Sequence, residues 1–221
     1  MPPDSFPIIV AGGHEFLSPD KAKDSPGIMT RLLAAYSQLP YDIFLLAPTD
    51  EQSIIQNYLS PNPSWHGPLT QPQVVSHKVQ DGTIAFVLFP DKQSHSLTGN
   101  KKLGNFIRNL RDTKEYNLIV GISSWGSDQE ENFLAAEPNT VDILLGSGDG
   151  PGYTGLYLQE NAALWVRAFS KGKAVSTITI PSLPAPQEKV IWEPEETIFT
   201  KTETLDHSIP LDDEMHTLLT D

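Results

Sequence analysis

The stretch from Tyr116 to Gly150 constrains the fold of this chain more than any other. Two short apolar runs, Leu118 to Ile122 and Val141 to Leu145, are rich in leucine and β-branched residues, and a helix-like segment of about a dozen residues separates them. This order predicts a strand, a helix and a second, parallel strand. Because the loops that follow parallel strands meet at one edge of a sheet, we expect the segments SSWGSDQEE and GSGDGPGY to lie side by side. A functional site is expected at that edge.

The N-terminal part of the chain repeats the same order of elements. Ile8 to Ala11 is a short apolar strand, residues 16–26 form a polar loop, and Gly27 to Leu39 has apolar residues at helical spacing before Pro40. Ile43 to Ala47 is the next apolar strand. Alternating strands and helices predict the α/β class.

Two hairpins are expected in addition. Asp81-Gly82 favours a tight turn between Val74–Val79 and Thr83–Phe89, and a Gly-Lys turn separates Leu164–Phe169 from Ala174–Ile180. These hairpins predict that the sheets mix parallel and antiparallel pairing. Further helices are expected from Gly104 to Leu110 and from Asp213 to Leu219.

The C-terminal part of the chain differs in composition from the rest. Residues 182–221 are rich in proline and acidic side chains, so we expect residues 1–181 to form an α/β domain and residues 182–221 an arm that packs on it. Residues 51–73 are also polar and proline-rich, and predict a short helix followed by an irregular surface segment. Long segments of this kind are typical of docking surfaces.

Composition excludes several classes of function. The net charge is −13 and the basic residues form no cluster beyond Lys101-Lys102 and Lys171-Lys173, so a nucleic-acid backbone would be repelled. No cysteine is present, which removes disulfides, thiolate metal ligands and thiol nucleophiles. No apolar run approaches the length of a membrane span, and the start MPPDSFPIIV has no signal-like pattern. We therefore expect a cytoplasmic protein if Met1 is the native start, and an exported one if a signal was removed.

The order of elements, the central stretch YNLIVGISSWGSDQEENFLAAEPNTVDILLGSGDG and the segments LWVRAFSKGKAVSTITI and LDHSIPLDDEMHTLL together resemble a known family. They are similar to the metallophosphatase domain of 5′-nucleotidases of the UshA type, which are calcineurin-like phosphoesterases. The resemblance covers nearly the whole chain. It implies a mixed two-sheet β-sandwich flanked by helices.

The resemblance is stronger in the scaffold than in the metal ligands. Three positions that match family motifs keep a side chain that could bind a metal: His14, Asp50 and Asp149. Four loop positions stand where the family has ligands and carry other residues: Gly12, Ser124, Gly148 and Gly150. Two-metal hydrolysis requires several oxygen or nitrogen ligands for each ion, and glycine supplies none. We therefore expect no cofactor beyond, at most, one weakly held divalent ion.

These observations favour a catalytically degenerate member of the family that acts as a binding or structural subunit of a protein complex. A partner with a basic surface would suit the net charge of −13. Trp65, between prolines in the long loop, either forms a contact surface or packs beneath that loop. Trp125 stands in a loop where the family's ligands point, and it is expected to fill the space that metals leave. Together with Trp65 it is also a candidate for a contact surface.

Two other functions stay open at this stage. An active phosphoesterase could assemble an atypical site from His14, Asp50 and Asp149 with His66 or His95. His14 is otherwise a solvated loop histidine, and Asp50 a helix cap.

A phosphate or nucleotide sensor could use GSGDGPGY as an anion cradle, or the segment is a plain turn. Ser123-Ser124 with Asp128 and Glu130 would be the components of a serine nucleophile site, but the sequence ties no histidine to them.

Overall fold

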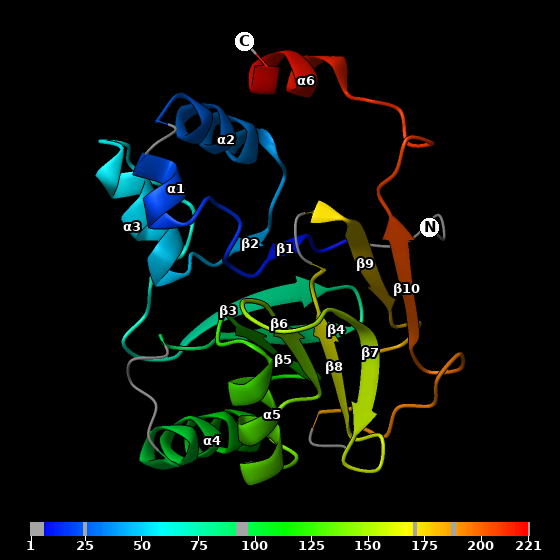
Figure 1. The fold of residues 1–221 in the computed structure, drawn as a ribbon. Coiled ribbons are helices and arrows are strands. Elements are labelled where there is room, and N and C mark those ends of the chain that lie inside the picture. Colours follow the sequence, from blue (N-terminus) through cyan, green and yellow to red (C-terminus); the bar gives the residue numbers. More distant parts are fainter. Residues whose placement is uncertain (1–6, 24–25, 92–96, 170–171, 187–188, 221) are drawn as a thin grey trace. The chain divides into compact units, whose positions relative to one another are not determined.

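The computed structural model describes residues 7–23, 26–91, 97–169, 172–186 and 189–220. Contacts divide the chain into two compact units, which are considered separately (Figure 1). Unit 1 comprises Met1–Pro68 and His207–Asp221, and unit 2 comprises Leu69–Asp206. This division differs from the expected boundary between residues 181 and 182, and that domain and arm stay a prediction.

Unit 1 is a small α/β arrangement. Strands β1 (Val10–Ala11) and β2 (Ile43–Phe44) pair in parallel, and Leu45 forms a further parallel bridge with His66. The helices of this unit are α1 (Pro19–Lys23), α2 (Pro26–Gln38), α3 (Pro48–Gln56) and α6 (Asp213–Thr220). The sequence predicts only a loop over residues 16–26. The structure has the short helix α1 there, and its Ala22 is completely buried in the core of the unit.

The core of unit 1 is largely aromatic. The ring of Trp65 stacks on Phe44 with centroids 4.1 Å apart, and Phe16 lies 5.9 Å from the same indole. Tyr36 meets Phe44 edge to face at 5.9 Å. Trp65 thus packs beneath its loop, where Met29 and Ile54 complete the core.

Unit 2 is built on a six-stranded mixed sheet in the order β3-β4-β5-β6-β8-β7. The strands are β3 (Gln73–Val79), β4 (Gly82–Leu88), β5 (Leu118–Ser123), β6 (Ile143–Gly146), β7 (Tyr153–Leu158) and β8 (Ala163–Arg167). The four central strands are parallel, and β3 and β7 pair antiparallel at the two ends. The first expected hairpin is confirmed, with Val79 opposite Gly82. The mixed α/β class is confirmed as well.

Two helices cover one face of this sheet. Helix α4 (Leu97–Asp112) contributes Leu103 and Ile107, and α5 (Ser127–Ala136) contributes Phe133 and Leu134 to the core. Figure 1 shows both helices on the same side of the strands. The predicted strand, helix and parallel strand of the central stretch are β5, α5 and β6, so this prediction is confirmed.

The prediction of a second hairpin, between Leu164–Phe169 and Ala174–Ile180, is wrong. Strand β9 (Ala174–Thr179) does not pair with β8 but with β10 (Phe199–Thr204), in a separate two-stranded antiparallel sheet. The physical reason is that β8 already pairs with β6 along one edge and with β7 along the other. The helix expected near the C-terminus is present as α6.

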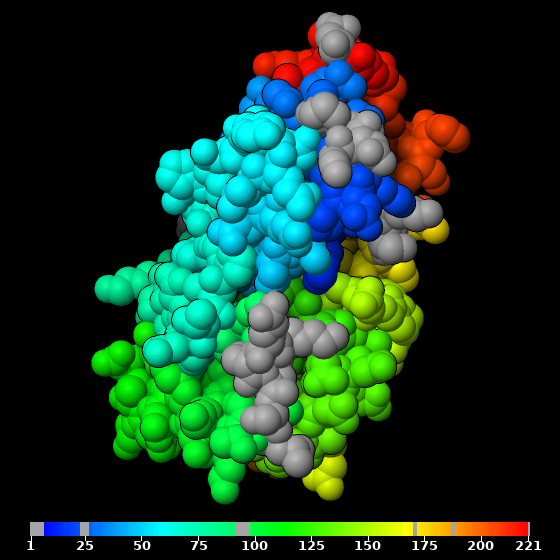
Figure 2. All heavy atoms as spheres, turned by 60° about the vertical axis from the view of Figure 1, so that its left-hand side comes forward, coloured from blue at the N-terminus to red at the C-terminus, as the bar shows by residue number. Residues whose placement is uncertain are grey.

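We predict that Phe133→Ala lowers the free energy of unfolding by about 3–5 kcal/mol, because a completely buried ring leaves a cavity. Its ring lies 5.1 Å from Phe89 and 5.9 Å from Trp125. Urea unfolding followed by tryptophan fluorescence measures the effect. The matched control is Ile55→Ala, a side chain 57% exposed on α3, whose surface is cyan in Figure 2; its effect should stay within about 0.5 kcal/mol. Equal effects of the two variants would contradict the assignment of this core.

Candidate functional site

The loops after β5 and β6 lie side by side, as the sequence predicts. The backbone N–H of Ser147 donates to the Ser123 carbonyl at 2.9 Å, and the N–H of Gly126 donates to the Ser147 carbonyl at 3.0 Å. Ser127 N–H donates to the Asp149 carbonyl at 2.8 Å. Gly150 has φ 111°, and a Cβ there would collide with the Ser127 side chain. A glycine is therefore required at this contact between the two loops.

An ion pair lies beneath these loops. Arg167, at the end of β8, pairs with Glu130 of α5, and the two side chains are 1% and 0% exposed. The same Glu130 oxygen accepts a hydrogen bond from the Trp165 indole at 3.0 Å. A Cβ at Gly146 would collide with this carboxylate, so the glycine leaves the space that Glu130 fills.

The Arg167 guanidinium also holds the backbone of the glycine-rich loop. Its Nη2 donates to the carbonyls of Ser147, Gly148 and Asp149 at 3.3, 3.0 and 2.9 Å, and its Nε donates to the Pro151 carbonyl at 2.9 Å. These carbonyls of the segment GSGDGPGY therefore face a buried cation. An anion cradle needs the opposite arrangement, with N–H groups converging.

The pKa of the Glu130 carboxyl is raised, because burial outweighs the opposing effects. These are the neighbouring Arg167 charge and the hydrogen bonds from Trp165 and Arg167, which lower the pKa. Sequence reasoning considers Glu130 for a serine site and does not single out Arg167. A signal for both is present: Glu130 precedes Phe133 and Leu134 at helical spacing on the buried side of α5, and Arg167 ends an otherwise apolar strand. Because a buried charge is costly without a partner, an acidic and a basic residue at two buried positions predict an ion pair between them.

Asp50 is the centre of the corresponding loops in unit 1. It is 1% exposed, at the start of α3, and its carboxylate accepts three backbone N–H bonds. These come from His14 at 2.7 Å, Ala47 at 3.0 Å and Phe16 at 3.2 Å. The pKa of the Asp50 carboxyl is raised, because burial outweighs the lowering effect of the three backbone hydrogen bonds. The carboxylate of Asp50, the third residue of α3, thus accepts the N–H of the N-cap residue Ala47 and fixes the loop after β1.

Two further polar side chains lie in the same loop. His14 is exposed, has φ 62° and places its Nδ1 3.4 Å from the Thr49 hydroxyl. The neighbouring Glu15 accepts a hydrogen bond from the Tyr36 hydroxyl at 3.0 Å. Burial raises the pKa of Glu15, and this bond lowers it. Burial and the Glu15 charge also raise the pKa of Tyr41 to about 12.

The candidate metal ligands fall on different units. His14 and Asp50 belong to unit 1, and Asp149 belongs to unit 2, where its side chain is exposed. Among the described residues, no group of three or more histidine, aspartate and glutamate side chains is placed to hold a metal ion. His66 contributes its backbone to a bridge with Leu45, and His95 lies outside the described residues.

The four loop positions that stand where the family has ligands lie in the loops described above. Gly12 precedes the loop that Asp50 fixes, and Ser124, Gly148 and Gly150 lie in the two loops beneath which Arg167 is buried. Trp125 is 2% exposed and donates its indole N–H to the Pro90 carbonyl at 2.7 Å. Trp125 therefore belongs to the core, and its side chain is not part of a contact surface. Ser123 is completely buried, and its hydroxyl accepts the backbone N–H of Trp125 at 3.2 Å.

Comparisons with known proteins identify a fold. No protein-family model and no curated protein sequence matches the chain. Among solved structures, NAD nucleotidase (NadN) from Haemophilus influenzae matches with a TM-score of 0.56 at 10% identity, over 96% of this chain and 51% of that one. A hypothetical protein from Thermus thermophilus matches with a TM-score of 0.42 at 11% identity, over 73% and 64%. The chain spans about half the length of the nucleotidase and shares a distant metallophosphatase-like fold with it.

In the part of the chain that the structure describes, no helix is both long and apolar enough to cross a membrane.

We predict that Arg167→Met lowers the free energy of unfolding by about 3–5 kcal/mol, because it leaves the Glu130 charge buried without a partner. The double variant Arg167→Met/Glu130→Met should regain part of the loss. The control is Lys201→Met, which breaks an exposed pair with Glu203 at 3.6 Å and should change stability by less than about 0.5 kcal/mol. An Arg167→Met variant as stable as the control would contradict the structural role of the pair.

The Arg167→Met loss should also depend on pH. Without the guanidinium, the pKa of Glu130 in the folded variant rises further, so the folded state binds a proton more tightly than the unfolded chain. The free energy of unfolding of the variant then falls as pH rises from about 4.3, the pKa of Glu130 in the unfolded chain, through the raised pKa of Glu130 in the folded variant. Urea unfolding at acid and neutral pH should show the larger loss at neutral pH.

A second substitution tests the role of Asp50. Asp50→Ala removes three charge-assisted bonds from backbone N–H groups, one of them from the N-cap residue of α3, and should lower the free energy of unfolding by about 2–4 kcal/mol. The control Asp20→Ala removes an exposed carboxylate of the same unit and should cost about 1 kcal/mol at most. Chemical denaturation measures both. Wild-type stability of Asp50→Ala would show that the carboxylate is free for another role.

Proposed function

We propose that this chain is a non-hydrolytic, metallophosphatase-like domain that acts as a binding or structural subunit of a protein complex. The observation that carries the proposal is the internal use of its buried charges. At both sets of strand-end loops, a charged side chain binds the chain's own backbone.

Arg167 supports the proposal in unit 2. Its guanidinium is hydrogen-bonded to four backbone carbonyls of residues 147–151 and is paired with Glu130. A divalent cation that bound the same carbonyls would have to displace the N–H groups of Arg167, whose charge Glu130 neutralises. The loop positions Gly148 and Gly150 offer no side chain as a ligand.

Asp50 supports the proposal in unit 1. A carboxylate that coordinates a metal would have to share or release the N–H bonds from His14, Phe16 and Ala47. Released N–H groups in a buried place cost about 1–3 kcal/mol each, so the capped arrangement is favoured. The fold shared with a nucleotidase is compatible with this interpretation, since one fold serves many functions.

The test is a hydrolysis screen of the purified 221-residue protein with Mn²⁺, Zn²⁺, Mg²⁺ and Ca²⁺. Substrates should include a nucleoside monophosphate and NAD, with bound metal measured by elemental analysis after dialysis. We expect no metal-dependent turnover above the protein-free rate and less than one equivalent of bound metal. Turnover that requires a metal and disappears in Asp50→Ala, with the fold retained by circular dichroism, would overturn the proposal.

A thermal-unfolding series with inorganic phosphate and nucleotides belongs to the same screen. A binding or structural subunit whose GSGDGPGY carbonyls face Arg167 should show no shift in melting temperature that saturates with phosphate. A saturating shift without turnover would favour the phosphate-sensor alternative.

A further inference from the structure

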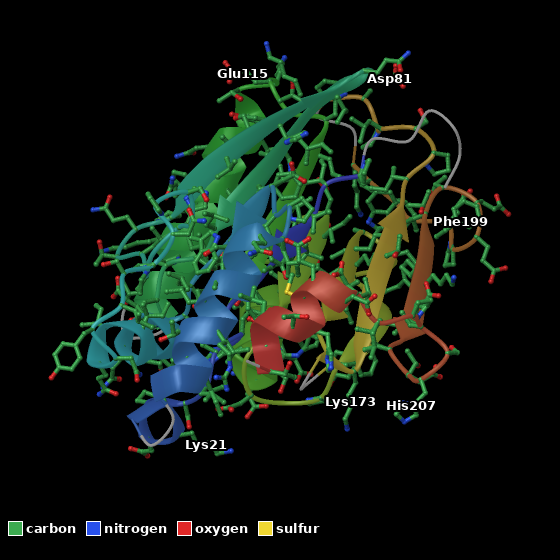
Figure 3. The ribbon with its side chains drawn as sticks, turned by 90° about the horizontal axis from the view of Figure 1, so that it is seen from above. Lys21, Asp81, Glu115, Lys173, Phe199 and His207 are labelled. Carbon is green, nitrogen blue, oxygen red and sulfur yellow. The ribbon has the colours of Figure 1, made fainter. Side chains whose placement is uncertain are left out.

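An open groove of about 540 Å³ lies on unit 2, between β7 and the start of β10. The residues that line it are Tyr157, Pro194, Glu195, Ile198, Phe199 and Thr200. Phe199 is 41% exposed at the start of β10, where Figure 3 labels it. The roles proposed for the strand-end loops do not use this groove.

The groove is held by contacts within unit 2. The Thr202 hydroxyl of β10 donates to the Thr154 hydroxyl of β7 at 3.1 Å, and Gly155 leaves room for Thr200 beside the same strand. The turn before β10 is also fixed: Glu195 N–H donates to the Ile198 carbonyl at 2.9 Å, and Glu193 N–H donates to the Thr197 hydroxyl at 2.9 Å. An apolar ring therefore stays exposed on a firm support, rather than on a loose loop.

The turn that carries the lining residue Glu195 forms an acidic rim. Glu193, Glu195 and Glu196 are all exposed within four residues of one turn. Lys201, two residues after Phe199 in β10, is paired with Glu203 at 3.6 Å. The charge of this rim has the same sign as the net charge of −13. An exposed aromatic side chain beside a cluster of carboxylates is complementary to an apolar side chain flanked by cations.

We propose that this groove docks a segment of a partner protein in which one apolar side chain stands between lysine or arginine residues. The apolar side chain packs on Phe199 and Tyr157, and the flanking cations lie against Glu193, Glu195 and Glu196. This inference rests on the proposed function, since it assigns a surface and a partner chemistry to the binding subunit.

The test uses the full chain and a fluorescein-labelled peptide in which one leucine stands between two pairs of lysines. Fluorescence anisotropy should show saturable binding that weakens in about 0.5 M salt, because the charges are then screened. Phe199→Ala should weaken binding by about tenfold, as expected for the loss of a central aromatic contact. Glu195→Gln/Glu196→Gln should weaken it and reduce its salt dependence.

Matched controls separate the groove from general attraction to an acidic protein. Glu115→Gln removes one exposed carboxylate of the same unit, well away from Phe199 in Figure 3, and should leave binding unchanged. A peptide with glycine in place of leucine should bind more weakly, and one with glutamates in place of lysines should not bind. Both groove variants should keep the wild-type melting temperature within a few degrees, since the altered side chains are exposed.

The proposal is overturned if the lysine–leucine peptide does not saturate, if the glycine peptide binds equally well, or if Phe199→Ala binds like the wild type. It is also overturned if sedimentation shows a dimer that Phe199→Ala dissociates, because the occupant is then a second copy of the chain. Failure of these experiments is distinct from failure of the proposed function, which metal-dependent turnover or a saturating phosphate shift in the screen would contradict.

Discussion

A buried positive charge, the guanidinium of Arg167, is the interaction on which unit 2 depends. A charge in the protein interior is costly unless its hydrogen-bonding groups are satisfied. Here Glu130 neutralises it, and the carbonyls of Ser147, Gly148, Asp149 and Pro151 accept its N–H groups. The end of β8, helix α5 and the loop after β6 are tied together by this one side chain. Gly146 and Gly150 are required nearby, because a Cβ at Gly146 would collide with Glu130 and one at Gly150 with Ser127 of the other loop.

Unit 1 uses a charge of the opposite sign in the same way. The Asp50 carboxylate has lost most of its water and receives three backbone N–H groups instead, so it joins the end of β1 to the start of α3. In both units the loops after parallel strands, where α/β proteins commonly bind ligands, are occupied by the protein's own charged groups. The proposal of a binding subunit follows from this use, and it places the contact with a partner on a different surface, where Phe199 and three glutamates are exposed.

Much of the fold could be predicted from local pattern. The runs Leu118 to Ile122 and Val141 to Leu145, with α5 between them, gave the central parallel strands because a continuous apolar run suits a strand buried on both faces. The turn at Asp81-Gly82 gave the β3–β4 hairpin. The pairing of β9 was predicted wrongly, because the partner of a strand depends on which edges are already occupied. Strand β8 was flanked by β6 and β7, and β9 paired with β10, about twenty residues further along the chain.

The sequence by itself determined the α/β class and the meeting of the loops after β5 and β6, since both depend on the fixed geometry of a strand–helix–strand unit. It also limited Asp50 to two candidate roles, because the residue stands where a strand meets a helix. Only the tertiary structure brings the Asp50 carboxylate to its donors His14 and Phe16, because these come from a loop 34 to 36 residues away. It also decided the pairing of Glu130 with Arg167, which are 37 residues apart. Local pattern reports which side chains are buried, but the partner of a buried charge is fixed by packing between distant segments.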